Sequence, residues 1–179
     1  MKELDPTVYN KHGSRKNFQP QYFQLYRACL STAWGLLDEA QMLTEKQSYA
    51  RAYALAFTAT EEIGKALVVA DYVYDLVSEQ EFQDAFKKHE IKLAYLESVF
   101  SAANGEPERD AVMLRQNFLQ RMSALYVGKS DDGSPEKPQQ CVSRDSALQM
   151  IAKVQEYLTS ILSAEWLNSP RIGSKALLK

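Results

Sequence analysis

Two glutamates and a lysine stand in the middle of an otherwise apolar stretch, and they are the first residues in this chain that suggest chemistry. The stretch covers residues 50–74 and reads ARAYALAFTATEEIGKALVVADYVY, with Glu61, Glu62 and Lys65 at its centre. At 100° per residue it is apolar on nearly every side, which is typical of a helix buried inside a fold. Buried charges need partners, because an unpaired one is costly. The sequence allows two interpretations: a surface ion pair between Glu61 and Lys65, or charges that line a covered site.

His89 is the second candidate, because it lies in the middle of an apolar helical stripe rather than at its edge. Lys92 follows three residues later and borders the same side, within the basic run KKHEIK. Nearby positive charges favour the neutral imidazole, which accepts a proton and so suits a general base. The lysines would add contacts to a phosphate. The alternative is a core histidine whose hydrogen bonds are satisfied within the fold.

Arg121 and Tyr126 form a third candidate, near the end of another helical pattern. Arg121 flanks the apolar side of that pattern, so it either covers the core with its aliphatic stem or offers its guanidinium to an anion. The usual metal motifs are missing: there are no paired His and Cys ligands, and Phe86 stands where a Glu-x-x-His motif would need a glutamate before His89. The chain has no Gly-rich phosphate loop either. We therefore expect neither a metal nor a cofactor.

Length and composition favour one soluble domain. The chain has 179 residues, 45% hydrophobic and 25% charged, which is ordinary for a globular protein. A formal net charge of −2 gives no global field that attracts nucleic acid, and it leaves room for a local basic cleft. The start lacks the apolar core of a signal peptide, and no apolar run reaches the roughly 20 residues that span a bilayer. We expect a cytoplasmic protein without a membrane segment. Its two cysteines, Cys29 and Cys141, are interpreted as reduced thiols, with a disulfide left open.

Apolar residues recur at helical spacing through most of the chain, so helices must position these candidates. Pro20 suits the first turn of a helix, Ser48 is a candidate N-cap, and Ser78 with Glu81 fits the capping-box pattern. A link of two or three residues makes the first two helices an antiparallel hairpin. The sequence predicts five helices, over residues 20–45, 49–76, 79–103, 108–127 and 143–166.

The predicted fold is an all-α, five-helix, up-and-down bundle that forms one domain over residues 20–167. Residues 1–19 are polar and predict a flexible N-terminal arm, and residues 168–179 predict a C-terminal tail. The polar segment 129–140, KSDDGSPEKPQQ, predicts a mobile loop before the last helix, because it holds two prolines and a glycine. No strand pattern or internal repeat is visible.

Three segments of the chain together resemble the AbiV family of abortive-infection proteins, which belongs to the HEPN superfamily. The segments are AYALAFTATEEIGKAL over residues 52–67, Phe86 with HEIK over residues 89–92, and RMSALYV over residues 121–127. The similarity covers roughly residues 25 to 165. It implies a small α-helical bundle that usually dimerises, and many HEPN domains are metal-independent ribonucleases of phage defence or toxin–antitoxin systems.

The chain departs from the usual HEPN signature, an arginine followed by a histidine at the R-x(4–6)-H spacing. The residues four to six after Arg121 are Leu125, Tyr126 and Val127, and neither histidine follows any arginine at that spacing. AbiV-like sequences also tend to have an aspartate after LYV, where this chain has Gly128. The resemblance therefore implies the fold more strongly than the ribonuclease chemistry.

Two functions follow from these residues. In the first, the chain is an anti-phage effector and a metal-independent ribonuclease with a polar site at a dimer cleft. His89 would act as general acid or base, Lys65, Lys92 and Arg121 would stabilise the phosphate, and Glu61 or Glu62 would hold a lysine or the imidazole. The predicted catalytic residues are His89, Lys65, Arg121 and Glu62, and the predicted binding residues are Glu61, Lys92 and Tyr126.

In the second function, the same residues form a buried network inside a non-catalytic helical homodimer. Such a dimer would work by binding a protein partner, from the phage or the host, or a nucleotide. The missing R-x(4–6)-H signature and the negative net charge favour this alternative, because RNA-binding proteins usually carry a basic surface.

Overall fold

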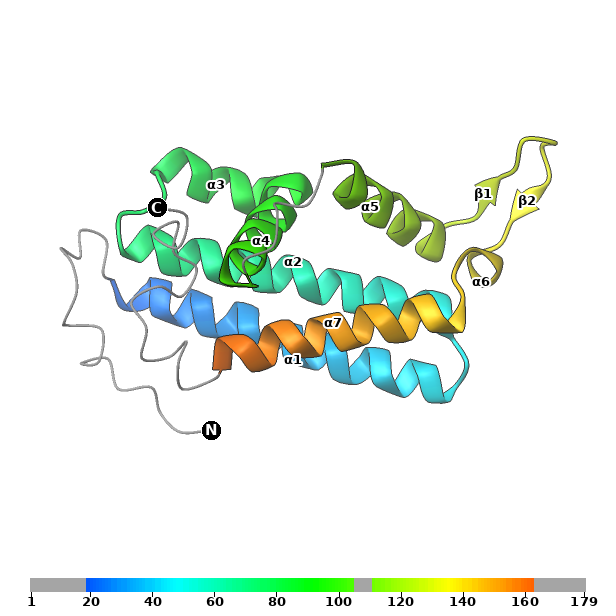
Figure 1. Ribbon diagram of the computed structural model, residues 1–179, viewed down its shortest axis with the longest axis horizontal. Helices are drawn as coiled ribbons and strands as arrows, with labels where there is room; N and C mark the ends of the chain where they lie inside the picture. The colour runs from blue at the N-terminus through cyan, green and yellow to red at the C-terminus, as the bar shows by residue number, and fades with distance from the viewer. Residues whose placement is uncertain (1–18, 105–110, 163–179) are drawn as a thin grey trace.

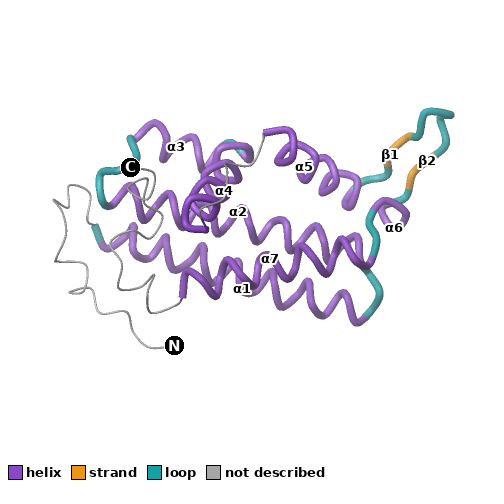
Figure 2. The backbone as a smooth tube through the Cα atoms, viewed as in Figure 1, coloured by secondary structure: helices purple, strands orange, loops and turns teal. Residues whose placement is uncertain are grey.

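The computed structural model describes residues 19–104 and 111–162, and most of these residues lie in helices (Figure 1, Figure 2). The predicted all-α class is confirmed. Seven helices and two very short strands are present in the described part of the chain. They are α1 (Pro20–Glu45), α2 (Tyr49–Val73), α3 (Glu79–Lys87), α4 (His89–Asn104), α5 (Ala111–Leu125), β1 (Gly128–Lys129), β2 (Pro135–Glu136), α6 (Pro138–Cys141) and α7 (Arg144–Leu162).

Helix α2 is the centre of the fold. Helices α1 and α7 run along one side of it, and α3, α4 and α5 lie over its other side (Figure 1). Its residues are buried on every face, from Ala50 near its start to Tyr72 near its end. The prediction that this apolar stretch is a buried central helix is therefore confirmed, and the charges in its middle lie where water is scarce.

The helix ends follow local sequence signals. Pro20 occupies the first turn of α1, as predicted. Ser78 and Glu81 form the predicted capping box, in which the Glu81 amide donates to Ser78 Oγ at 3.3 Å and the Ser78 amide donates to Glu81 Oε2 at 2.9 Å. Ser48 does take the N-cap position of α2, but its side chain makes no capping hydrogen bond. Between α1 and α2 the chain turns at Gln47, which has a φ of 56°.

The predicted third helix is two helices in the structure. Lys88 adopts an extended conformation with φ −114° and ψ 124°, which ends α3, and α4 starts at the next residue in a different direction (Figure 1). Neither proline nor glycine marks this junction, so local sequence gives no sign of the break. The break brings the first turn of α4, with His89 and Lys92, against α2.

The predicted loop at 129–140 also contains structure. Strands β1 and β2 pair as a small antiparallel hairpin that extends away from the helices, and the short helix α6 follows it (Figure 1, Figure 2). Gly133 turns the hairpin with a φ of 85°, a conformation that favours glycine. Strands of two residues are too short to show an alternating pattern of apolar and polar residues, so no strand was predicted here.

Four predicted segments fall wholly or partly outside the description. Apart from Gln19, the N-terminal arm at 1–19 lies outside the described residues, as do the C-terminal tail at 168–179, the predicted end of the last helix and the first residues of the predicted helix 108–127. Among the helices that are described, none has the length and hydropathy needed to cross a membrane.

Candidate active site around Glu61

Glu61 lies in the middle of α2, and only 3% of its surface is exposed. Three positively charged or protonatable side chains surround its carboxylate. His89 Nδ1 lies 2.8 Å from Oε1, Arg121 Nη1 lies 3.7 Å from Oε1, and Lys92 Nζ lies 3.9 Å from Oε2. Residues from α2, α4 and α5 thus meet at one buried carboxylate. We call this group of four residues the Glu61 cluster.

The His89 imidazole is oriented by this carboxylate. A carboxylate only accepts hydrogen bonds, so the ring hydrogen at the contact belongs to Nδ1, and Nε2 of a neutral ring is left as an acceptor. The side chain is 45% exposed, and its ring lies 5.8 Å from that of Phe118 on α5. No hydrogen bond to Nε2 is present among the described residues, so the partly exposed imidazole offers an acceptor nitrogen, as a general base requires.

Lys92 is buried almost completely, with 5% of its surface exposed. Burial lowers the pKa of its ammonium group, while the nearby Glu61 carboxylate acts in the opposite direction. The ammonium is beyond hydrogen-bonding distance of Glu61, at 3.9 Å, and the described residues offer it no hydrogen bond. Its N–H donors are therefore available for a further acceptor.

Arg121 reaches the cluster from α5 and is 84% buried, since its side chain keeps an exposed fraction of 16%. Its guanidinium carbon lies 5.7 Å from the centre of the Phe57 ring, within cation–π distance. Its Nε is buried and has no hydrogen-bond partner within the described part of the chain. Like Lys92, Arg121 is held close to Glu61 with donor capacity to spare.

Glu62 and Lys65 form a separate pair beside the cluster. Lys65 Nζ lies 2.5 Å from Glu62 Oε1, and the ammonium also lies 5.9 Å from the centre of the Phe86 ring. The sequence order favoured a pair between Glu61 and Lys65, and in the structure the lysine pairs with Glu62 instead. Glu61, rather than Glu62, is the acid that contacts His89.

The structure thus brings together four of the seven predicted site residues, Glu61, His89, Lys92 and Arg121. Tyr126 lies just beyond the end of α5, 59% exposed, and is not part of the cluster. Phe57, Phe118 and Gly64 were not among the predicted site residues, although a glycine inside a long helix is a recognised sign of close packing. No group of three or more potential metal ligands lies close together among the described residues.

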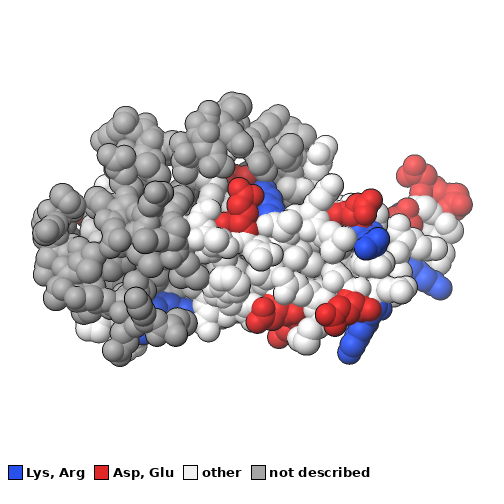
Figure 3. Space-filling model, turned by 60° about the horizontal axis from the view of Figure 1, so that its bottom comes forward, with Lys and Arg blue, Asp and Glu red and all other residues white. Residues whose placement is uncertain are grey.

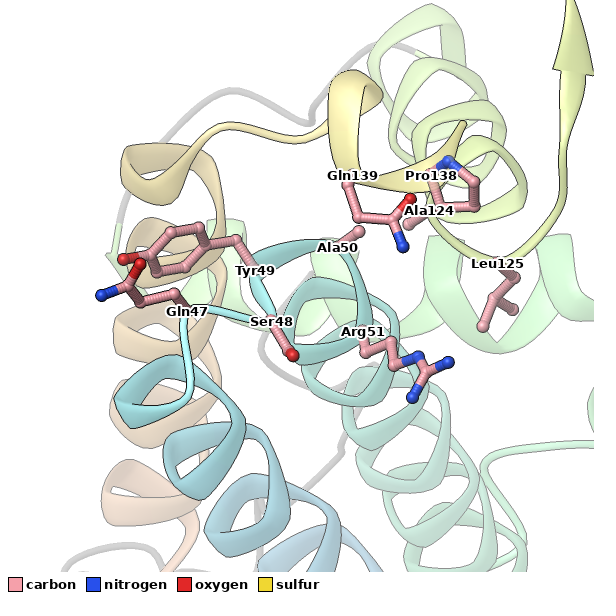
Figure 4. A pocket seen from close by; sticks show the side chains of 9 residues that line it. All are labelled: Gln47, Ser48, Tyr49, Ala50, Arg51, Ala124, Leu125, Pro138 and Gln139. Carbon is pink, nitrogen blue, oxygen red and sulfur yellow. The ribbon is translucent and has the colours of Figure 1, made fainter. Parts of the chain in front are cut away.

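A cavity of about 330 Å³ lies elsewhere, at the end of the molecule near the α1–α2 turn (Figure 4). Figure 4 shows side chains from the start of α2, the end of α5 and α6 around it. None of the residues that line it belongs to the Glu61 cluster. This cavity and the Glu61 cluster are therefore different places.

The comparison with protein families gives a match over most of the chain. A family model described as AbiV, of the HEPN group, matches residues 21–159. The chain belongs to the AbiV family. All described helices except the last residues of α7 and the first of α1 fall inside the matched range, as does the whole Glu61 cluster. Neither the comparison with curated proteins nor the one with solved structures gave a match.

Within this AbiV-family chain, an arginine and a histidine meet without the R-x(4–6)-H spacing. Arg121 comes from α5 and His89 from the first turn of α4, and each contacts the same oxygen of Glu61, at 3.7 and 2.8 Å. Folding therefore places the two residue types together that the usual signature places on one helix.

Proposed function

We propose that this protein is a cytoplasmic effector of abortive infection that cleaves RNA without a metal ion, at the Glu61 cluster. The observation that carries the proposal is the contact of His89 Nδ1 with the buried Glu61 carboxylate, with Lys92 and Arg121 within 4 Å of the same group. A base, the acid that orients it and two cations are the parts that phosphodiester cleavage by an internal hydroxyl needs.

His89 acts as the general base. Its Nε2 takes the proton of a ribose 2′-hydroxyl, and the 2′-oxygen attacks the adjacent phosphorus. The bond from phosphorus to the 5′-oxygen breaks, and that oxygen takes a proton from water at the half-exposed side of the imidazole. The hydroxide left from this water takes the proton from the His89 imidazolium, which restores the neutral base. The products are a 2′,3′-cyclic phosphate and a 5′-hydroxyl. Glu61 keeps the proton of the imidazole on Nδ1 and stabilises the imidazolium as it forms.

Lys92 and Arg121 stabilise the negative charge that develops on the phosphate oxygens. Both have N–H donors without a hydrogen-bond acceptor among the described residues. A buried cation close to developing charge has a large effect, because little water screens it. Lys65 adds positive charge at the edge of the site, and Glu62 holds it in place at 2.5 Å.

A second copy of the chain completes the site in this proposal. The outward side of α5 and the residues after it expose several large apolar side chains next to Arg121: Leu119, Met122, Leu125, Tyr126 and Val127. Exposed apolar groups of this kind are typical of protein interfaces. A homodimer formed there would place a cleft beside His89, with Tyr126 at its edge as an RNA contact. The face formed by α1 and α7 shows charges of both signs in small, separate groups, which supports a nucleic-acid site elsewhere (Figure 3).

The test is cleavage of total RNA in the presence of a chelator by wild type, His89→Ala and His12→Ala. His12 is the other of the two histidines and lies outside the described residues, so it is the matched control. We expect wild type and His12→Ala to release fragments that end in a 2′,3′-cyclic phosphate, and His89→Ala to lose about 10²–10⁴-fold in rate. Equal cleavage by His89→Ala, or none by wild type at any concentration, would contradict the proposal.

The second candidate is a homodimer without catalysis, which binds a protein partner or a nucleotide. The burial of Glu61, with 3% of its surface exposed, favours it, because buried ion pairs are also used as structural networks. This alternative predicts that Glu61→Gln and His89→Ala each destabilise the fold by several kcal/mol, as broken buried networks do. A catalytic cluster instead predicts a small loss or a gain for His89→Ala, measured by urea unfolding.

A further inference from the structure

We propose that Gly64 is a positioning residue of the Glu61 cluster, because its missing side chain sets the distance between α2 and the first turn of α4. Gly64 lies in the buried interior of α2, three residues after Glu61. A Cβ atom built on it would lie 2.3 Å from the carbonyl oxygen of Lys92, 2.9 Å from its carbonyl carbon and 3.3 Å from its Cβ. The nearest atoms are backbone atoms of α4, which a rotamer change does not move.

The contact falls at the place where α4 supplies the cluster. His89 is the first residue of α4, and Lys92 is one turn further along. Both side chains face Glu61 from this turn, at 2.8 and 3.9 Å. The close contact of α4 with Gly64 and the two side chains that face Glu61 therefore fall within the same four residues of α4.

A methyl group at residue 64 would force the helices apart. To reach an ordinary contact of 3.4 Å or more with the Lys92 oxygen, α4 would retreat by about 1 Å, since backbone atoms do not overlap. The bond between His89 Nδ1 and Glu61 Oε1 is 2.8 Å long, and an added ångström puts it outside hydrogen-bonding distance. Lys88 is extended between α3 and α4, and in this proposal it is the hinge about which α4 moves.

Gly35 is a matched control on the neighbouring helix. It lies in the middle of α1 on the solvent-exposed side, and a Cβ built there would meet no atom within 4 Å. Alanine at position 35 therefore changes only the helix propensity, which it improves. Any effect of Gly64→Ala that Gly35→Ala lacks belongs to the contact with α4.

The tautomer of His89 tests this inference. It rests on the proposed function for its catalytic consequence, but the measurement needs no RNA cleavage. With ¹⁵N-labelled histidine, the chain gives two imidazole spin systems, and His12→Gln assigns them. Under conditions where the rings are neutral, we expect wild type and Gly35→Ala to carry the His89 proton on Nδ1. Gly64→Ala should shift to the mixture of tautomers of an unpaired imidazole.

A second variant keeps the test of Gly64 decisive even if Gly64→Ala alone is unstable. The Gly35→Ala/Gly64→Ala double variant guards against a loss of stability, because the first change offsets part of the second. A folded variant with alanine at position 64 and the wild-type His89 spectrum would overturn the inference. So would a double variant that does not fold, since the hinge at Lys88 should let α4 retreat while the bundle persists. In an active wild type, Gly64→Ala lowers kcat about 100-fold, as a misplacement of about 1 Å does.

Discussion

Among the described residues, two glutamates are buried and lie near a lysine, Glu61 and Glu97, and their surroundings differ. Glu97 on α4 accepts a hydrogen bond from Lys153 Nζ at 2.5 Å and another from Tyr157 Oη at 3.0 Å, both from α7. Glu61 on α2 faces three cationic or protonatable groups, yet only the contact with His89 has hydrogen-bond length. The Glu97 carboxylate is hydrogen-bonded to its lysine, whereas the Glu61 carboxylate has two cations nearby, Lys92 and Arg121, to which it is not hydrogen-bonded.

On the proposed function, this difference distinguishes a structural pair at Glu97 from the proposed site at Glu61. The Asp71 carboxylate on α2 also has a donor in direct contact: the Tyr95 hydroxyl donates to its Oδ2, and burial with the nearby carboxylate raises the pKa of Tyr95, so that Tyr95 stays a donor. A fold that needed only internal stability would close the Glu61 cluster in the same way, because unsatisfied buried donors are costly. Surplus cationic donors around one carboxylate are instead what an anionic ligand requires.

The largest expected effect is on RNA cleavage. Lys92→Met and Lys153→Met each replace a mostly buried lysine by an apolar side chain of similar length, one in the Glu61 cluster and one beside Glu97. We expect Lys92→Met to lower kcat about 10²–10³-fold, as loss of one electrostatic stabiliser does. Lys153→Met should leave kcat unchanged, because Lys153 serves Glu97. Initial rates on a short RNA, with a chelator present, give the comparison; equal losses in both variants would remove the distinction between the two glutamates.

The same two variants should have the opposite order in stability. Lys153→Met removes a 2.5 Å hydrogen bond and leaves Glu97 with one partner fewer, at a cost of about 1–3 kcal/mol in the free energy of unfolding. Lys92→Met removes an ammonium that makes no hydrogen bond among the described residues, so stability should stay constant or rise by up to about 1 kcal/mol. Urea unfolding at one protein concentration measures both. A larger loss for Lys92→Met would mean that the Glu61 cluster is the structural network.

Sequence patterns predict most helices of this fold, because the helices are long and their apolar residues recur regularly. The prediction for α1, residues 20–45, coincides with Pro20–Glu45, and the all-round apolar character of α2 correctly marks it as the centre. The break at Lys88 escapes such patterns, because the apolar spacing continues across it and no proline or glycine interrupts it. From this break onward α4 packs against α2, a tertiary contact that local propensity does not predict.

For the candidate site, sequence indicates which residue types matter and not which neighbours meet. Glu61 and Glu62 differ by one residue, hence by 100° around the helix, and only packing decides which of them faces α4. In the structure Glu61 contacts His89 of α4, while Glu62 pairs with Lys65 on its own helix. Gly64 illustrates the same limit, because its role depends on a carbonyl oxygen 28 residues away along the chain, that of Lys92.

The smallest expected effect is a dependence of stability on pH that belongs to Lys92. Burial lowers the pKa of this lysine; Glu61 and Glu62 act against the shift, and Lys65 and Arg121 act with it. Below the lowered pKa, the folded and unfolded chains both hold the proton, and wild type carries the full cost of burying an ammonium group. Between that pKa and the ordinary value of 10.5, the folded chain has released the proton while the unfolded chain keeps it, so stability rises with pH.

The free energy of unfolding of wild type should therefore rise relative to that of Lys92→Met as the pH increases from neutrality towards 10.5. Urea unfolding of both proteins across this range measures the difference, and Gly35→Ala, which changes no charge, should keep a constant difference from wild type. If the difference between wild type and Lys92→Met also stays constant, the ammonium group of Lys92 is stabilised as well in the folded wild type as it is by water in the unfolded chain. Lys92 would then have no N–H donor left for an anion, and the proposed difference between the surroundings of Glu61 and Glu97 would be wrong.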